Sequence, residues 1–330
     1  MIEICQFGAG SIGAIHAANI ARHPDARLRY VVDVDADAAA ALAASHGAEA
    51  VDRDTAFADE AVDAVVIASS TDSHADLMIA AAQADKVIFC EKPIDLDIGR
   101  VDACLGEVER AGVKLVVGFN RRFDPSFRAL HEALRAGRIG TVELVAITSR
   151  DPGLPSIEYL KSSGGLFRDM MIHDFDMARW LLGEEPVEVF ASASCLIDPA
   201  VGEIGDVDTA VATLKTARGA LCQIGNSRRA TYGYDQRIEV LGSGGMLRAG
   251  NRRATTVETF DGEAVSRDKP LYFFLERYAE AYRAELDHFV DVVAGNAEPL
   301  TGGDDGRRAL VLADAANESV ATGRPVRLAP

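Results

Sequence analysis

A glycine-rich turn near the amino terminus constrains the fold more than any other feature of this sequence. The run Gly8-Ala9-Gly10-Ser11-Ile12-Gly13 directly follows the apolar segment Ile2–Phe7 and opens a segment of helical composition, Ile12–His23. Glycines at this spacing permit a tight turn from a strand into a helix, and they let a phosphate group approach the amides at the start of that helix. Glycine-rich turns are common, so the surrounding sequence decides how this one is interpreted.

Residues 1–120 alternate short, β-branched apolar runs with longer alanine-rich segments. Strands are apolar along their whole length when helices cover both faces of a parallel sheet. The alternation therefore predicts an α/β protein in which residues 1–120 form a Rossmann domain with a doubly wound parallel sheet. The expected strands are Ile2–Phe7, Leu28–Asp33, Ala64–Ala68, Lys86–Cys90 and Lys114–Gly118, and the expected helices are Ile12–His23, Ala36–His46, Ser73–Ala84 and Gly99–Ala111.

Past residue 120, extended segments follow one another across short turns. Successive strands on short connections form an antiparallel or mixed sheet. We therefore predict that residues 121–330 form an α+β domain with a large, mostly antiparallel sheet that is open on one face. The expected strands are Val142–Thr148, Glu188–Leu196, Thr209–Leu214, Ala220–Asn226, Gln236–Leu241 and Thr255–Phe260, and the expected helices are Ser126–Ala136, Phe167–Leu182, Leu275–Ala294 and Asp304–Thr322.

The composition argues against several classes of protein. A net charge of −17 disfavours nucleic acid and anionic membrane surfaces as partners, because like charges repel. The 5 cysteines are scattered and never spaced as CxxC, which is typical of reduced thiols in a cytosolic protein. There is no signal-peptide pattern and no run of about 18 apolar residues, the length that a transmembrane helix needs. We expect a cytoplasmic protein that binds neither nucleic acid nor membrane.

An acidic residue at the end of the second expected strand indicates which dinucleotide is bound. Asp33 lies twenty residues after Gly13. A carboxylate there accepts hydrogen bonds from the adenosine ribose and repels the 2′-phosphate of NADP, which favours NAD. Asp33 ending a strand in an ordinary turn is the alternative, and Asp35 is the neighbour that would replace it. The expected cofactor-binding residues are Gly8, Gly10, Ser11, Ile12, Gly13, Asp33, Ser70, Thr71, His74, Glu91, Lys92 and Asn120.

A lysine at the end of the fourth expected strand is a candidate reacting group. Glu91-Lys92-Pro93 follows Lys86–Cys90, and the carboxyl ends of parallel strands line the ligand crevice of such a sheet. When a hydride leaves an alcohol carbon, charge builds on the oxygen, and an ammonium group stabilises it. A cis bond before Pro93 would fix the backbone of Lys92. The alternative is a surface lysine in a salt bridge.

A second candidate pair lies in the helix expected at Phe167–Leu182. Asp169 and His173 are four residues apart, so one helical face would present both side chains. Oxidation of an alcohol without a metal needs a base, and histidine titrates in the useful range. The alternative is a histidine that packs or caps structurally. His173 and Asp176 have no third ligand at metal spacing, so we expect no metal site.

A serine hydrolase is poorly supported, because the sequence contains no GxSxG motif. The run Ser69-Ser70-Thr71 instead fits the loop after the third expected strand, where cofactor contacts fall. The residues therefore favour hydride transfer over hydrolysis.

Four motifs together resemble one family over essentially the whole chain. They are GAGSIG, the EKP motif at Glu91–Pro93, the run GFNRRFDP at Gly118–Pro125, and the Asp169–His173 pair. The chain resembles the glucose–fructose oxidoreductase/inositol dehydrogenase/rhizopine-catabolism (Gfo/Idh/MocA) family. The resemblance implies Lys92, Asp169 and His173 as the catalytic set, with His173 as the proton acceptor and NAD as the hydride acceptor. It also implies a homotetramer assembled through the sheets of the second domain.

Within that family, three runs resemble the bacterial inositol dehydrogenases: Thr148–Pro152, Asn226–Arg237 and Phe273–Tyr278. The resemblance implies oxidation of a secondary hydroxyl of inositol, from myo-inositol to 2-keto-myo-inositol (scyllo-inosose). A related cyclitol or monosaccharide dehydrogenase that uses NAD or NADP stays open, as does a regulatory protein that binds dinucleotide without turnover. The expected substrate-binding residues are Lys92, Arg122, Asp151, Asp169, His173, Tyr232 and Tyr234.

The substrate contacts have ordinary alternatives. Arg122 would pair with Asp124, and Tyr232 and Tyr234 would pack at a subunit interface. Hydroxyl-rich rings suit hydrogen-bonding side chains of these kinds. The motifs therefore indicate the chemistry more firmly than they indicate the substrate.

Overall fold

The computed structural model describes residues 1–328 and divides the chain into two compact units. The first unit consists of Met1–Phe123 and Ala281–Leu310, and the second consists of Asp124–Glu280 and the described chain from Val311 onward. The segment Ala281–Leu310 therefore packs with the first unit, although it follows the strands of the second in sequence. The predicted division of the chain into domains of residues 1–120 and 121–330 stays a prediction.

Within the described residues, the first unit contains a parallel sheet of six strands in the order β3-β2-β1-β4-β5-β6. The order reverses between β1 and β4, as in a doubly wound fold. The strands are β1 (Ile2–Phe7), β2 (Ala26–Val32), β3 (Glu49–Ala50), β4 (Ala64–Ile67), β5 (Val87–Glu91) and β6 (Leu115–Gly118). The helices are α1 (Ser11–Arg22), α2 (Ala36–His46), α3 (Arg53–Ala58), α4 (Thr71–Gln83), α5 (Ile98–Ala111), the short 3₁₀ helix η1 (Asn120–Phe123) and α12 (Ala279–Val293).

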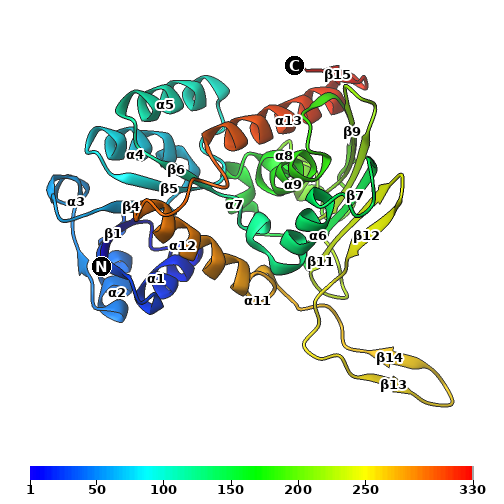
Figure 1. Ribbon diagram of the computed structural model, residues 1–330, viewed down its shortest axis with the longest axis horizontal. Coiled ribbons are helices and arrows are strands. Elements are labelled where there is room, and N and C mark those ends of the chain that lie inside the picture. Colours follow the sequence, from blue (N-terminus) through cyan, green and yellow to red (C-terminus); the bar gives the residue numbers. More distant parts are fainter. Residues whose placement is uncertain (329–330) are drawn as a thin grey trace. The chain divides into compact units, whose positions relative to one another are not determined.

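Helices cover both faces of this sheet, with α4 and α5 on one side and α1 and α12 on the other (Figure 1). Strands β4 and β6 are buried along their whole length for that reason. Leu286, Phe289 and Val290 of α12 pack into the same core as Ile4 of β1 and Ile20 of α1. Burial of these apolar side chains explains why a segment from late in the sequence belongs to the first unit.

The second unit contains a sheet of seven strands, among the residues described, in the order β12-β11-β7-β10-β9-β8-β15. The β7–β10 pair is parallel and the other pairs are antiparallel, which confirms the predicted class. The strands are β7 (Val142–Arg150), β8 (Pro186–Ser194), β9 (Thr209–Thr216), β10 (Leu221–Ser227), β11 (Asp235–Gly242), β12 (Gly245–Ala249) and β15 (Val326–Arg327). The remaining helices are α6 (Pro125–Arg135), α7 (Ile157–Ser162), α8 (Gly165–Asp169), α9 (Ile172–Leu182), α10 (Pro199–Glu203), α11 (Phe274–Arg277) and α13 (Gly303–Thr322), of which α13 belongs to the first unit as far as Leu310.

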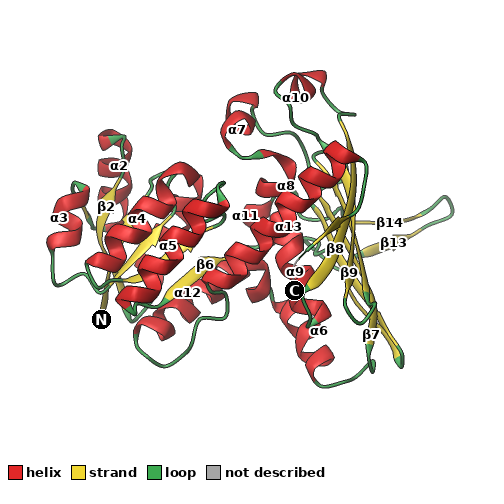
Figure 2. Ribbon diagram, turned by 90° about the horizontal axis from the view of Figure 1, so that it is seen from above, coloured by secondary structure: helices red, strands yellow, loops and turns green. Residues whose placement is uncertain are grey.

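One face of the seven-stranded sheet is covered by α6, α8 and α9, which lie together on one side of its strands (Figure 2). Burial alternates along β9 and, from Gln236 onward, along β11, so every second side chain there faces away from those helices. The exposed apolar residues on these strands and their neighbours are Phe190, Val211, Leu221, Leu241 and Met246. The second unit thus has the open sheet face that the sequence predicts.

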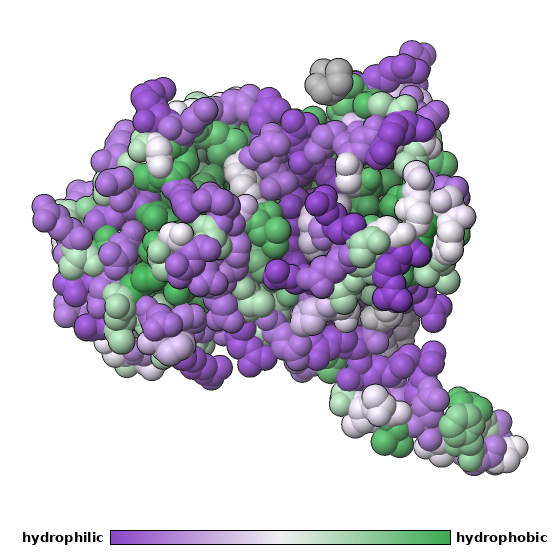
Figure 3. Space-filling model, in the orientation of Figure 1, coloured by the Kyte–Doolittle hydropathy of each residue, from purple (hydrophilic) through white to green (hydrophobic). Residues whose placement is uncertain are grey.

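A separate hairpin extends away from the sheet of the second unit (Figure 1). It is formed by β13 (Glu258–Phe260) and β14 (Val265–Arg267). The strand expected at Thr255–Phe260 therefore pairs in this hairpin and does not join the large sheet. Hydrophobic side chains gather near the far end of the hairpin (Figure 3), where Phe260 and Val265 are exposed.

Two further elements differ from those expected from the sequence. Gly242–Gly245 is indeed a turn, but it leads directly into β12, which pairs with β11. The helix expected at Leu275–Ala294 is divided into α11 and α12 at Tyr278. Across residues 1–328, no helix combines the length and the apolar character needed to cross a membrane.

Candidate active site

The predicted cofactor residues of the first unit gather at one edge of its sheet. All strand pairs described in this sheet are parallel, so their carboxyl ends meet at that edge. Ligands of open α/β sheets bind outside these ends. The residues that follow strand ends are Gly8 after β1, Asp33 after β2, Ser70 and Thr71 after β4, Lys92 after β5 and Asn120 after β6.

The glycine-rich turn is shaped by close approaches of the backbone. Gly8 has a φ of +106°, and a Cβ there would lie 2.3 Å from the carbonyl oxygen of Ala68. A Cβ at Gly13 would lie 2.2 Å from the carbonyl oxygen of Gly8. By contrast, a Cβ at Gly10 would meet no atom within 4 Å. Gly8 and Gly13 are therefore required by the fold, while Gly10 leaves open space in which a ligand can approach the backbone.

The start of α1 suits an anion. Gly10 is the N-cap, no side chain caps the helix, and the first turn has no acidic residue. The first amides of the helix therefore carry the positive end of its dipole without competition from a carboxylate. Ser11 and Ile12 are the first two residues of α1. This turn fits the pyrophosphate of a dinucleotide.

Asp33 is fixed at the end of β2. Its Oδ2 accepts a hydrogen bond of 2.6 Å from the backbone N–H of Ala9, and its Oδ1 accepts one of 2.9 Å from that of Asp35. Asp35, the neighbour considered as a replacement, is the N-cap of α2 and accepts from the amides of Asp37 and Ala38. Its side chain is therefore engaged in the helix, and Asp33 is the better placed of the two to contact a ribose.

Lys92 directly follows β5, and its peptide bond to Pro93 is cis. The preceding Glu91 is buried, with Oε1 2.7 Å from Nε2 of His16 on α1. Burial and the charge of Glu91 raise the pKa of the fully buried Glu285 carboxyl well above its ordinary value. Glu91, His16 and Glu285 therefore form a buried acid–base cluster in the first unit. Its member Glu91 is the residue directly before Lys92 in sequence.

His74 contacts main-chain carbonyl groups on both sides of its ring. Nδ1 lies 2.8 Å from the oxygen of Pro93, and Nε2 lies 3.1 Å from the oxygen of Ser69. Burial lowers the pKa of His74, whose side chain is 1% exposed. His74 thus links the turn after β5 to the turn after β4, and its predicted contact with the cofactor stays a prediction.

Arg122 is held within the first unit by partners other than the one considered from sequence. It is buried, its Nη2 lies 2.7 Å from Oδ1 of Asp305, and its Nη1 donates to the carbonyl oxygen of Leu300. Asp124, the expected alternative partner, instead forms a buried ion pair with Arg277. The role of Arg122 in substrate binding stays a prediction.

Asp169 and His173 do not share one regular helix, so the expectation of a continuous helix is wrong. Asp169 ends α8 and His173 lies in the first turn of α9. The amides of both Met170 and Met171 donate to the carbonyl oxygen of Leu166, so the regular i→i−4 pattern is interrupted between the two helices. The two residues are four apart in sequence, but they do not lie on one face of a single regular helix.

The carboxylate of Asp169 is held by two side chains that the sequence analysis did not identify. The Tyr159 hydroxyl donates a hydrogen bond of 2.8 Å to Oδ1, and the Arg228 guanidinium lies 3.1 Å from Oδ2 through Nη2. Burial, with the Asp169 and Asp151 charges, raises the pKa of Tyr159. Tyr159 and Arg228 lie 10 and 59 residues from Asp169 in sequence, so no local spacing could have indicated them.

The start of α9, which carries His173, is anchored to the sheet of the second unit. The next residue, Asp174, is fully buried. Its carboxylate accepts hydrogen bonds from Ser149 Oγ of β7 and from Asn226 Nδ2 of β10. Two strands thereby fix the first turn of α9, which limits the positions open to His173.

The remaining substrate candidates lie near the ends of β7 and β11. The Tyr232 hydroxyl donates to Asp235 Oδ2 over 2.6 Å and accepts from Arg150 Nη1 over 2.9 Å. Tyr234 is buried and packs edge-on against Tyr278, with ring centroids 5.9 Å apart. Tyr234 therefore packs within its own chain, while Tyr232 keeps part of its ring exposed.

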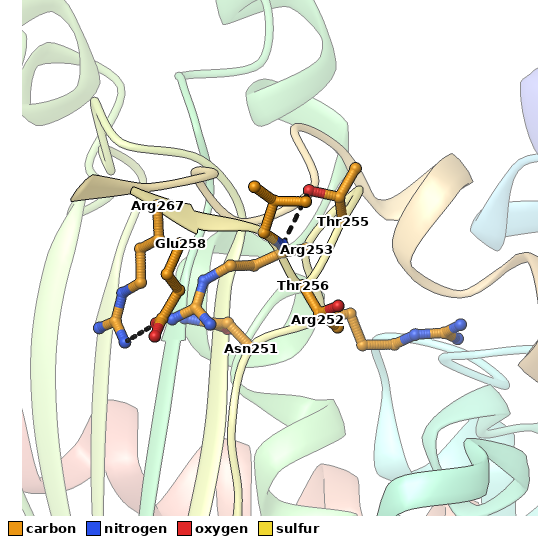
Figure 4. Close-up of a pocket in the computed structure, with 8 residues that line it drawn as sticks. Asn251, Arg252, Arg253, Thr255, Thr256, Glu258 and Arg267 are labelled. Carbon is orange, nitrogen blue, oxygen red and sulfur yellow. Dashed lines mark hydrogen bonds and ion pairs between the residues drawn. The ribbon is translucent and has the colours of Figure 1, made fainter. Parts of the chain in front are cut away.

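The cavity of about 440 Å³ at the base of the hairpin contains none of the predicted site residues. Figure 4 shows the ion pair of Glu258 with Arg267 beside it, with 3.7 Å between Oε1 and Nη1. Over the described chain, no group of three or more His, Cys, Asp or Glu side chains is placed to hold a metal ion. The cavity is lined by Asn251, Arg252, Arg253, Thr255, Thr256, Val257, Glu258 and Arg267.

The strand order, the glycine-rich turn and the acid after β2 define a protein with a dinucleotide-binding Rossmann fold. Comparison with known families agrees. Residues 2–119 match the oxidoreductase family with an NAD-binding Rossmann fold, and residues 127–248 match the Gfo/Idh/MocA C-terminal domain. The chain belongs to the Gfo/Idh/MocA family of oxidoreductases. The predicted fold class, family and NAD cofactor are thereby confirmed.

Individual relatives are similar over almost the whole chain. Over 322 residues the chain is 52% identical to the inositol 2-dehydrogenase of Rhizobium meliloti (strain 1021), covering 98% of each protein. It superimposes on a myo-inositol dehydrogenase from Corynebacterium glutamicum with a TM-score of 0.96 and 44% identity, covering 100% of this chain and 99% of that one. A scyllo-inositol dehydrogenase from Lactobacillus casei, solved with NAD(H) and scyllo-inositol, gives a TM-score of 0.92 and 30% identity over 99% of both chains.

Proposed function

We propose that this chain is an NAD-dependent inositol 2-dehydrogenase that oxidises one secondary hydroxyl of the ring, converting myo-inositol to 2-keto-myo-inositol (scyllo-inosose). The observation that carries the proposal is the similarity to inositol dehydrogenases over 98% of the chain. The geometry of the first unit supports NAD as the partner in the reaction. The open space at Gly10, the uncapped start of α1 and the carboxylate of Asp33 suit its pyrophosphate and adenosine ribose.

The reacting groups proposed are Lys92, Asp169 and His173. NAD, when bound, supplies the hydride acceptor for the carbon that is oxidised. The Lys92 ammonium donates a hydrogen bond to the oxygen of the reacting hydroxyl and stabilises the negative charge that builds there. His173 accepts the proton of that hydroxyl, and neutral imidazole is a suitable base near pH 7. The Asp169 carboxylate accepts a hydrogen bond from the substrate and orients it against His173.

The other proposed substrate contacts are Arg122, Asp151, Tyr232 and Tyr234. A ring that carries a hydroxyl on each carbon needs several donors and acceptors to fix its orientation. Tyr232 is the best supported of these, because its hydroxyl joins Arg150 and Asp235 and part of its ring is exposed. Tyr234 is the least supported, because it is buried against Tyr278.

We also propose a homotetramer that assembles through the open face of the seven-stranded sheet. Its apolar side chains, among them Val211 at 50% exposure, support an interface there. A cytoplasmic location is supported by the free thiols of all five cysteines, which all lie within the described part of the chain.

A substrate panel tests the proposed function. Purified protein is mixed with myo-, scyllo- or chiro-inositol or with glucose, each with NAD and with NADP, and absorbance of the reduced cofactor is followed. We expect NADH from at least one inositol, with kcat/KM for NAD well above that for NADP. Turnover of glucose alone would point to a sugar dehydrogenase. No turnover with any compound would remove the proposal and favour a regulatory protein.

A further inference from the structure

The carboxylate of Asp169 is contacted by two side chains, Tyr159 and Arg228, that are not part of the expected catalytic set. Each oxygen of this carboxylate has a partner on a different element. Tyr159 on α7 donates to Oδ1 over 2.8 Å, and Arg228, which directly follows β10, lies 3.1 Å from Oδ2. A carboxylate has about four acceptor positions, so these contacts fix its plane and leave capacity for a substrate hydroxyl.

The Arg228–Asp169 contact is a buried ion pair. The side chain of Arg228 is 1% exposed and that of Asp169 is 12% exposed. Among the described residues, Asp169 is the ion-pair partner of Arg228, and Nε of the same guanidinium is buried without a hydrogen bond. An arginine is always charged, and its burial is tolerable only beside a compensating negative charge. Arg228 therefore requires Asp169 to remain ionised.

Tyr159 contributes a neutral hydrogen bond from its hydroxyl. The residue is 49% exposed, and burial is the leading cause of the raised pKa of its hydroxyl. The Asp169 and Asp151 charges raise that pKa further, and the Arg228 charge opposes them. The phenol stays protonated near pH 7 and donates to Asp169.

These contacts separate the role of Asp169 from that of His173. An ionised Asp169 that is paired with a buried guanidinium is a poor proton acceptor, because taking up a proton would leave Arg228 uncompensated. It remains a strong acceptor for a hydrogen bond from a substrate hydroxyl. Proton transfer is therefore left to His173, whose helix is anchored independently through Asp174.

We propose that Arg228 and Tyr159 are positioning residues of the dehydrogenase reaction: they hold Asp169 ionised and in one orientation, so that it binds a ring hydroxyl while His173 takes the proton. The inference rests on the proposed function. Neither residue touches the substrate in this scheme, and both act through Asp169.

The test uses the full-length enzyme and three variants. Arg228→Met removes the charge at similar length, Arg228→Lys restores the charge without the planar fork, and Tyr159→Phe removes one hydroxyl. Arg168→Met is the matched control, because Arg168 precedes Asp169 in sequence but pairs with Asp314 over 2.6 Å. The measurements are kcat and KM for the polyol, the pH profile of kcat/KM, and the dissociation constant for NADH by fluorescence.

In Arg228→Met the pKa of Asp169 should rise by about 1–3 units, the range by which a neighbouring arginine shifts an aspartate, so the acid limb of the kcat/KM profile should become steeper below the ionisation of His173. Arg228→Lys should reverse most of that rise. Tyr159→Phe should raise KM for the polyol about tenfold or more, as expected for loss of a hydrogen bond to a charged group. NADH binding should stay within about twofold of wild type in every variant, since 0.4 kcal/mol is about a twofold change.

Arg228→Met and Tyr159→Phe with wild-type pH profiles and wild-type KM would overturn the inference. Equal effects in Arg168→Met would also overturn it, since they would show a general disturbance of α8. If Arg228→Met fails to fold, Tyr159→Phe decides by its KM, because that residue is half exposed. If the wild-type enzyme does not turn over any polyol, the proposed function is refuted. If the wild type is active and the variants have wild-type kinetics, only the positioning roles are refuted.

Discussion

Oδ2 of Asp33 accepts a hydrogen bond of 2.6 Å from the backbone N–H of Ala9, which joins the end of β2 to the glycine-rich turn after β1. The carboxylate is thus fixed beside the place where the adenosine ribose of NAD is expected. Asp33→Ser should lower kcat/KM for NAD by about 10–100-fold, the value of a hydrogen bond to a charged group, and should lower the preference over NADP.

Asp35→Ser is the matched control for that experiment. Asp35 caps α2, and serine is also a good N-cap, so the helix should be kept while one nearby negative charge is lost. Steady-state rates with both cofactors measure the preference. An unchanged ratio of NAD to NADP in Asp33→Ser, or an equal change in Asp35→Ser, would contradict the role of Asp33.

Two glycines of the same turn should respond differently to alanine. Gly8→Ala combines a positive φ of +106° with a Cβ 2.3 Å from the oxygen of Ala68, so it should lower stability by at least about 1–2 kcal/mol. In Gly10→Ala the added Cβ meets no atom within 4 Å. Its Tm should therefore stay within about 2 °C of wild type, which corresponds to a change of less than about 1 kcal/mol in stability. The substitution should instead raise KM for NAD, because the added methyl group occupies space that the pyrophosphate approaches. Thermal unfolding and cofactor kinetics on both variants check the contrast, which fails if Gly10→Ala binds NAD normally.

The proposed reacting groups can be separated from cofactor binding. Lys92→Ala and His173→Ala should each lower kcat by about 10²–10⁴-fold, the usual contribution of a positioned acid or base. NADH fluorescence titration should give dissociation constants close to wild type. Lys161→Ala serves as a control for removal of an exposed lysine from α7. Loss of NADH binding equal to the loss of activity in both variants would show that the roles are misassigned.

The predicted cofactor residues can be placed at one edge of the sheet from the sequence because their signals are local. The turn at Gly8, the acid at Asp33 and the lysine at position 92 each follow a strand directly, and a parallel sheet brings all such positions to one edge. Their identification needed only the alternation of strands and helices. The fold class followed from the same alternation.

The side chains that contact Asp169 could not be predicted from the sequence, because the contacts join segments that are distant in sequence. Arg228 lies 59 residues from Asp169, and it follows β10, whose place in the sheet depends on pairing with β7 and β9. The break between α8 and α9 was also hidden, because Phe167 to Leu182 is continuous in helical composition and the interruption is a matter of which amides bond to Leu166. The packing of α12 on the first unit likewise depends on contacts between distant segments, such as Phe289 with Phe89.

The open sheet face should respond to charge. Val211→Glu or Leu241→Glu places a carboxylate among apolar side chains, and burying an unpaired charge in an interface costs several kcal/mol. Either variant should shift the protein from the proposed tetramer to smaller species in size-exclusion chromatography with light scattering, while circular dichroism stays unchanged. Leu196→Glu is the control, since Leu196 is exposed and apolar but lies beyond the end of β8. A tetramer that survives both face variants would place the interface elsewhere.

The buried carboxyl of Glu285 should make stability depend on pH. Burial, and then the charge of Glu91, raise its pKa well above the ordinary value of 4.5, and neither oxygen has a hydrogen-bond partner among the described residues. Above pH 4.5 the unfolded chain releases this proton while the folded chain keeps it, so the folded state binds more protons. The contribution of Glu285 to the free energy of unfolding therefore falls as pH rises, until the folded pKa is passed.

Glu285→Gln removes the titration and keeps the shape of the side chain. The amide's own burial cost is the same at every pH, so it displaces the stability curve without changing its slope. The stability of the variant relative to wild type should increase with pH from about pH 5 until the folded pKa of Glu285 is passed, by up to about 1.4 kcal/mol per unit, the value of one proton. Urea unfolding at four pH values measures this slope. Glu109→Gln, on the exposed side of α5, should run parallel to wild type. Parallel curves for Glu285→Gln as well would mean that Glu285 is ionised in the folded protein.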